Sequence, residues 1–162
     1  NYIQATVSDI TSREKTERAL LASEKNYRTL SDNVPVGIFR SNPAGNGTLL
    51  AVNPMMATMF GYDSKSDLVK QEPNILFNNP EYRLSFLDKL NSSGIVENFE
   101  ASMCRKDGSE FWASISARYL RQKDDDESCM IDGIITDVSE RKRHEETLRR
   151  SLDSLKEAVE GD

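Results

Sequence analysis

Short apolar runs between residues 36 and 137 alternate with turn residues and predict a definite order of elements. Strands are expected over 36–40, 48–52, 95–104, 110–120 and 130–137. Helices are expected over 54–60 and 80–90, with brief turns over 64–69 and 74–77 between them. This order predicts an α+β domain: a five-stranded antiparallel sheet with its helices on one face, flanked by N- and C-terminal connecting helices.

Turn and cap residues fit the boundaries of these elements. Asn53 is placed to cap the helix that begins at Pro54. The sequence Lys106-Asp107-Gly108-Ser109 predicts a hairpin turn, with Gly108 at a positive φ. A second hairpin turn is expected over the acidic stretch 123–127, which lacks the glycine and the ligand spacing of a calcium loop.

The start of the chain resembles its end. Residues 3–13 recur, offset by 128 positions, as residues 131–141, and the match continues through Leu20 and Leu148. We therefore interpret residues 1–11 as the terminal strand of a preceding repeat and 12–30 as a connecting helix. Residues 31–138 are then one complete domain, and 139–162 an exit helix.

The exit helix carries an apolar seam, Leu148, Leu152, Leu155 and Val159, with spacings of four, three and four. This is the a/d pattern of a parallel coiled coil and predicts a homodimer. The alternative is an amphipathic helix that folds back on its own sheet.

Composition narrows the possible functions. The formal net charge of −6 and the lack of a clustered basic patch argue against nucleic-acid binding. No run of 18 apolar residues and no signal-peptide pattern occur, so we expect a soluble fragment without membrane contact. Cys104 and Cys129 lack metal-ligand spacing, and two free thiols suit a cytoplasmic location.

No catalytic constellation is recognisable. The sequence contains no Ser/His/Asp or Cys/His arrangement and no phosphate-binding loop, so we expect no enzymatic activity and no metal site in this fragment. The single histidine, His144, is interpreted as a solvated helix residue.

Four motifs in order carry a resemblance to a known family. They are Asn53-Pro54 with Ala57, Phe60-Gly61-Tyr62, Arg105-Lys106-Asp107-Gly108 with Phe111-Trp112, and the run from Gly133 to Lys142. Together they resemble PAS (Per-Arnt-Sim, S-box) sensory domains over nearly all of residues 24–143. The resemblance implies that the domain sits in tandem with other PAS domains upstream of a histidine kinase, cyclase or phosphodiesterase output, where such domains bind small ligands or dimerise. We favour a sensor histidine kinase as the parent protein. Asp9-Ile10-Thr11 would then be the exit motif of a preceding PAS domain.

Asp137 and Ser139 lie where the last strand becomes the exit helix. The Asp137 carboxylate is placed to accept from backbone N–H groups or to pair with a basic side chain, and so to fix the direction of the helix. If a signal leaves through this helix, these two residues are the joint; a plain helix cap is the alternative.

Alternation along the strands, small alanines and a group of methionines predict an internal pocket. The alternative is ordinary core packing, and a cavity lined by Ala101, Ala113 and Met59 would favour ligand sensing. Trp112 falls on the opposite face, where the N-terminal helix or a second protomer should cover it. The pocket candidates are Phe39, Met55, Met56, Met59, Phe77, Leu87, Phe99, Ala101, Met103, Ala113 and Ile115, and the predicted dimer or helix contacts are Trp112, Leu148, Leu152 and Leu155.

Cofactor chemistry known in PAS domains can be tested against these residues. Residues 81–90 contain no histidine for haem, and 74–80 contain no cysteine for a covalent flavin or chromophore. A noncovalent flavin stays open, and a small carboxylate or other metabolite, or no ligand at all, is favoured. The expected function is a sensory relay that binds a small ligand noncovalently, with a structural dimerisation spacer as the alternative.

Overall fold

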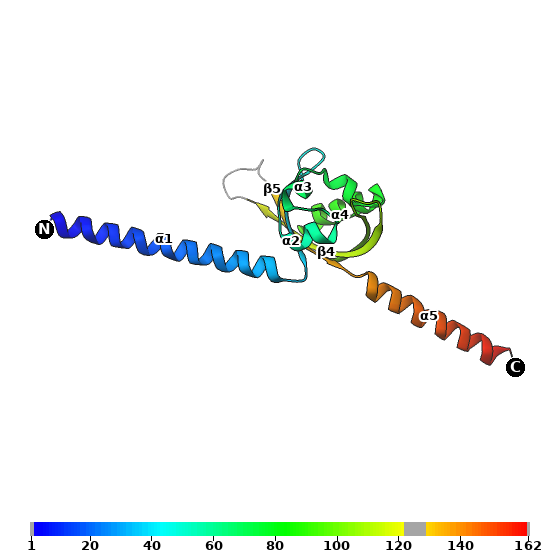
Figure 1. Ribbon diagram of the computed structural model, residues 1–162. Coiled ribbons are helices and arrows are strands. Elements are labelled where there is room, and N and C mark those ends of the chain that lie inside the picture. The colour runs from blue at the N-terminus through cyan, green and yellow to red at the C-terminus, as the bar shows by residue number, and fades with distance from the viewer. Residues whose placement is uncertain (1, 122–128, 162) are drawn as a thin grey trace. The chain divides into compact units, whose positions relative to one another are not determined.

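The computed structural model describes residues 2–121 and 129–161 (Figure 1). The second predicted hairpin turn, over 123–127, lies outside the described residues. The chain divides after Val34 into two compact units, which are described separately below.

The first unit is a single helix, α1 (Tyr2–Asn33), with no buried residue. The strand predicted over residues 1–11 is therefore wrong, and so is the predicted helix start at residue 12. Thr11 lies inside the helix and donates its hydroxyl hydrogen to the Val7 carbonyl oxygen at 2.9 Å. The physical reason is that a lone strand leaves its backbone groups unpaired, whereas a helix pairs them within the segment. The assignment of this segment to a preceding repeat stays a prediction.

The second unit contains a five-stranded antiparallel sheet in the order β2-β1-β5-β4-β3. The last strand in the sequence, β5, therefore lies at the centre, between β1 and β4. Each predicted strand is confirmed, with ends within two residues of those expected. The strands are β1 (Gly37–Asn42), β2 (Thr48–Val52), β3 (Ile95–Cys104), β4 (Glu110–Arg121) and β5 (Cys129–Asp137).

The helices between β2 and β3 cover one face of this sheet (Figure 1). They are α2 (Pro54–Met59), α3 (Lys65–Val69), the 3₁₀ turn η1 (Pro73–Leu76) and α4 (Pro80–Ser93).

Asn53 caps α2 as predicted and also ties it to β1. Its Oδ1 accepts from the backbone N–H groups of Met56 at 3.1 Å and Ile38 at 2.9 Å, and its Nδ2 donates to the Val36 carbonyl oxygen. Asn53 is buried, so these bonds satisfy polar groups that water does not reach.

The core lies between the helices and the sheet. Phe60, Leu68, Leu90 and Ile135 are its largest fully buried side chains. On α4 the buried positions are Phe86 and Leu90. Leu84, on the same helix, is 65% exposed.

After β5 the chain continues as α5 (Ser139–Glu160), in which no residue is buried. The apolar seam of α5 is solvent-exposed, with Leu148 at 62%, Leu152 at 50% and Leu155 at 63%. In the part of the chain that the structure describes, no helix has the length and apolar character to cross a membrane.

Candidate functional site

An internal cavity of about 60 Å³ lies between the sheet and α4. A water molecule needs roughly 10–15 Å³ measured in this way, so the cavity has room for a few non-hydrogen atoms. The inner residues are almost fully buried, whereas Arg83 and Leu87 of α4 and the residues of the β1–β2 turn are half-exposed and form the outer end. The lining residues are Phe39, Ser41, Asn42, Pro43, Gly47, Leu49, Met56, Pro73, Leu76, Phe77, Arg83, Phe86, Leu87, Met103, Ile115, Ile131 and Ile135.

Six of the eleven predicted pocket residues line this cavity: Phe39, Met56, Phe77, Leu87, Met103 and Ile115. Ala101, Ala113 and Phe99 are buried in the core but do not line the cavity. Met55 and Met59 are half-buried and also lie outside the lining.

In the sequence analysis, a cavity lined by Ala101, Ala113 and Met59 was the feature expected to favour ligand sensing over close packing. None of these three residues lines the observed cavity. Period-two alternation assigns a side chain to a face of the sheet but not to a position along the strand where the covering helix leaves space. The binding role of the predicted residues stays a prediction.

Eleven lining residues were not predicted, and Arg83 is the charged one among them. It lies on α4 one turn before Leu87, and its Nη2 donates to the Asn46 carbonyl oxygen in the β1–β2 turn at 2.8 Å. Burial lowers the pKa of its guanidinium. Arg83 lies four residues before Leu87, a predicted pocket residue, and therefore on the same face of the helix. This spacing is the sequence signal that could have identified it.

The β1–β2 turn is shaped to receive this arginine. Gly47 has a φ of 81°, and a Cβ atom there would lie 2.5 Å from Arg83 Nη2. Glycine alone meets both conditions without strain.

Outside the cavity, hydrogen bonds between residues of β4, β5 and α5 hold the junction of β5 and α5 in place. Asp137 Oδ1 accepts from the Ser139 N–H at 2.9 Å, and Ser139 Oγ accepts from the Trp112 N–H at 2.9 Å. The Val138 N–H donates to the Trp112 carbonyl oxygen at 2.8 Å. We call Trp112, Asp137, Val138 and Ser139 the exit joint; it fastens the first turn of α5 to β4.

Asp137 also pairs with a basic side chain, so both interactions considered for it occur together. Arg105 Nη2 lies 3.2 Å from Asp137 Oδ2, and Arg105 Nε donates to the Met59 carbonyl oxygen at 3.1 Å. The Arg105 guanidinium also stacks on the Phe111 ring, 4.4 Å from its centroid. Arg105 therefore connects the end of α2 to the exit joint.

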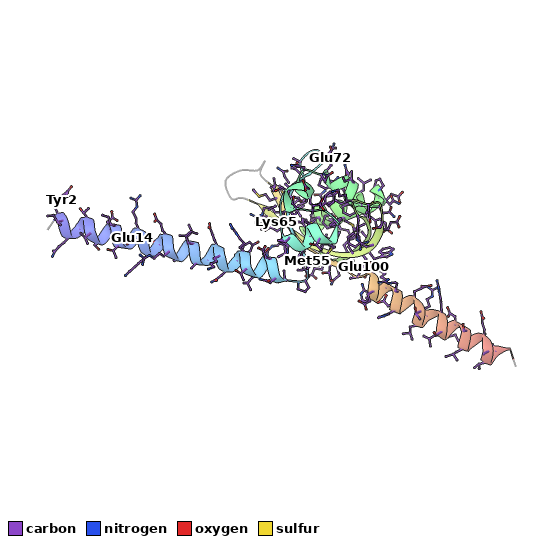
Figure 2. The ribbon with its side chains drawn as sticks, in the orientation of Figure 1. Tyr2, Glu14, Met55, Lys65, Glu72 and Glu100 are labelled. Atoms are coloured by element: carbon purple, nitrogen blue, oxygen red, sulfur yellow. The ribbon has the colours of Figure 1, made fainter. Side chains whose placement is uncertain are left out.

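A second set of contacts, the ion-pair cluster of Glu100, Arg141 and Lys142, joins α5 to β3. Glu100 pairs with Arg141 and, at 2.5 Å, with Lys142 Nζ. Figure 2 shows Glu100 at the sheet beside the start of α5. Hydrogen bonds from Lys142 and then Arg141 lower the pKa of the Glu100 carboxyl.

Trp112 is half-buried by residues of its own unit. Lys142 Nζ lies 4.4 Å from the ring centroid, and the Tyr82 ring packs edge-on at 6.1 Å. The sequence analysis expected the N-terminal helix or a second protomer to cover this ring, and missed Lys142 and Tyr82.

A family model described as a PAS domain matches residues 35–140, about two thirds of the chain. The chain belongs to the PAS domain family. The five strands, the helices between β2 and β3, and the exit joint all fall within the matched residues.

Individual relatives agree with the PAS assignment. The chain is 28% identical over 141 residues to the sensor histidine kinase TmoS of Ectopseudomonas mendocina, covering 85% of this chain but only 14% of that protein. The fold is similar to that of an RNA-binding light-oxygen-voltage receptor, with a TM-score of 0.66, 21% identity, and coverage of 83% of this chain and 38% of that one. It is also similar to a PAS domain from Colwellia psychrerythraea, with a TM-score of 0.61, 22% identity, and coverage of 72% and 97%.

Proposed function

We propose that this PAS domain is the sensory and relay module of a sensor histidine kinase, binds a small molecule noncovalently in its cavity, and passes its state to α5 in a dimer. The observation that carries the proposal is the course of β5. Ile131 and Ile135 line the cavity, and Asp137 of the exit joint follows two residues later on the same strand. A side chain displaced by a ligand would thus act on the strand that fixes the start of α5.

The size of the cavity limits the ligand. Pockets that hold drug-sized molecules measure roughly 300–1,000 Å³. The cavity, at about 60 Å³, suits a much smaller molecule unless core side chains move. A flavin ring would require such movement.

The parent protein's activity is inferred from its relative. The similarity to a sensor histidine kinase supports a longer parent protein whose catalytic region lies outside this domain, with this domain as a non-catalytic input. Cys104 and Cys129 are free thiols, as is usual in the cytoplasm, where we place the domain.

The dimer proposal rests on α5. Leu148, Leu152, Leu155 and Val159 are exposed and follow a heptad spacing, so a second copy of this helix could bury them. Changing Leu152 to Lys should convert the dimer to a monomer, measured by light scattering. Ser154→Lys adds the same charge off the seam and should leave the dimer intact.

The ligand proposal is tested by native mass spectrometry of the purified chain, paired with its denatured mass and an absorbance scan. We expect a mass excess that is lost on denaturation. Leu87→Trp should fill the cavity and remove the excess, whereas Leu84→Trp, on the exposed face of the same helix, should retain it. A clean dimer mass with no excess in the unsubstituted chain would favour the dimerisation spacer.

A further inference from the structure

Arg83 differs from those arginines of the domain that form ion pairs. Arg40, Arg105 and Arg141 each pair with a carboxylate, Asp132, Asp137 and Glu100 respectively. Among the described residues, no carboxylate forms an ion pair with Arg83, although its side chain is half-buried. Its Nη2 donates a hydrogen bond to the Asn46 carbonyl oxygen.

A half-buried guanidinium without a counter-ion is energetically costly, because burial removes water and no opposite charge replaces it. The group stays protonated in spite of this, since arginine does not lose its proton in proteins. Its fork of N–H donors matches the two oxygens of a carboxylate. With one hydrogen engaged by Asn46, hydrogens on other nitrogen atoms are left for a ligand.

The remainder of the cavity is apolar. Met103, Ile115 and Ile135 at its inner end are 2%, 3% and 1% exposed. The polar lining residues Ser41, Asn42 and Arg83 come from the end of β1 and from α4, so the two ends of the cavity differ in chemistry. A ligand that fits both must have a charged head and an apolar body.

We propose that the cavity takes a short-chain monocarboxylate, with its carboxylate on Arg83 and its alkyl chain directed toward Ile115 and Ile135. The proposal rests on the ligand-binding function proposed above and specifies its chemistry. One cation favours one negative charge, and the volume holds about four to six non-hydrogen atoms, which allows an alkyl chain of about four carbons with the carboxylate at the half-exposed outer end. Arg83 also holds the β1–β2 turn through Asn46, so carboxylate binding would act on β1, which pairs with β5.

The test compares three probes of equal length, pentanoate, pentanamide and pentylammonium, titrated into the full 162-residue chain at fixed ionic strength and followed by isothermal calorimetry and by NMR of the methionine methyl groups. We expect pentanoate to bind about tenfold or more tightly than pentanamide, and pentylammonium most weakly. Arg83→Gln should abolish the preference for pentanoate, and Arg83→Lys should retain part of it. Lys65→Gln removes the same charge from exposed α3 and should leave the preference unchanged.

The outcomes separate this inference from the proposed function. Equal binding of pentanoate and pentanamide would show an occupied cavity without anion selection, which overturns the inference but leaves ligand sensing intact. Failure of all three probes to bind overturns the inference, and native mass spectrometry then decides on sensing independently. If Arg83→Gln does not fold, the comparison of probes on the unsubstituted chain decides alone; retained binding of pentanamide by that variant shows that its cavity is intact.

Discussion

The helix-covered face of the sheet and its opposite face are stabilised by different interactions. Beneath the helices, Phe60, Leu90 and Ile135 pack with at most 1% of their surface exposed. On the opposite face, Arg40 pairs with Asp132 at 2.6 Å and Lys142 with Glu100 at 2.5 Å, with side chains that are about 29–47% exposed. Packing contributes most of the stability and depends little on salt, whereas exposed ion pairs contribute little and are screened. The ion-pair cluster therefore orients α5 more than it stabilises the fold.

Truncation in the core should have the largest effect. Phe60 is fully buried and packs edge-on against Phe111, with ring centroids 5.2 Å apart. Phe60→Ala should lower the free energy of unfolding by about 3–5 kcal/mol, measured by urea denaturation. Leu50→Ala on the opposite face, where the side chain is 45% exposed, is the control and should cost less than about 1 kcal/mol. Similar losses in both variants would contradict the contrast between the faces.

Removing the buried cap should have the next largest effect. Asn53→Ala leaves the backbone groups of Val36, Ile38 and Met56 without a partner and should cost about 2 kcal/mol. Asn79→Ala removes the exposed cap of α4, whose side chain accepts from the Glu81 N–H, and should cost about half as much. Thermal unfolding of the pair measures the difference, and equal losses would show that burial of Asn53 adds nothing.

At the exit joint the effect should be smaller and local. Asp137→Asn removes the ion pair to Arg105. The Asp137 and Arg105 side chains are 37% and 28% exposed, so the free energy of unfolding should fall by about 1 kcal/mol or less. Hydrogen exchange at the start of α5 should nevertheless rise, because Asp137 and Ser139 close this junction. A double-mutant cycle with Arg105→Gln measures the coupling. A coupling of zero, with unchanged exchange, would remove Asp137 from the joint.

The ion-pair cluster should show the smallest effect and a defined pH dependence. The pKa of the Glu100 carboxyl is lowered in the folded state by hydrogen bonds from Lys142 and Arg141. Its contribution is therefore full above the pKa of the unfolded chain, about 4.3, and is lost as the pH falls through the lower folded pKa. Glu100→Gln should cost less than about 1 kcal/mol at pH 7, and the difference should vanish in acid and shrink at 1 M salt. Urea unfolding at several pH values measures it; a difference that grows in acid would be inconsistent with this sign.

The sequence was sufficient to predict the strands of the domain because their residues alternate and their turns contain Gly108 and other specific turn residues. It failed for residues 1–11, where a strand-like composition without neighbouring strands formed part of α1. Six of the predicted pocket residues line the cavity, but neither Arg83 nor the space beside it follows from the spacing of apolar residues. Both depend on how α4 and the β1–β2 turn meet after folding.

The central position of β5 has a consequence for the order of folding. The β1–β2 and β3–β4 hairpins can each form from neighbouring residues, but they do not pair with each other. β5, the strand that joins them, is the last of the five strands to be synthesised. On the ribosome the two hairpins therefore share no sheet until residue 137 has emerged. A truncation before Cys129 should accordingly yield two hairpins that do not pair in one sheet, rather than a smaller domain.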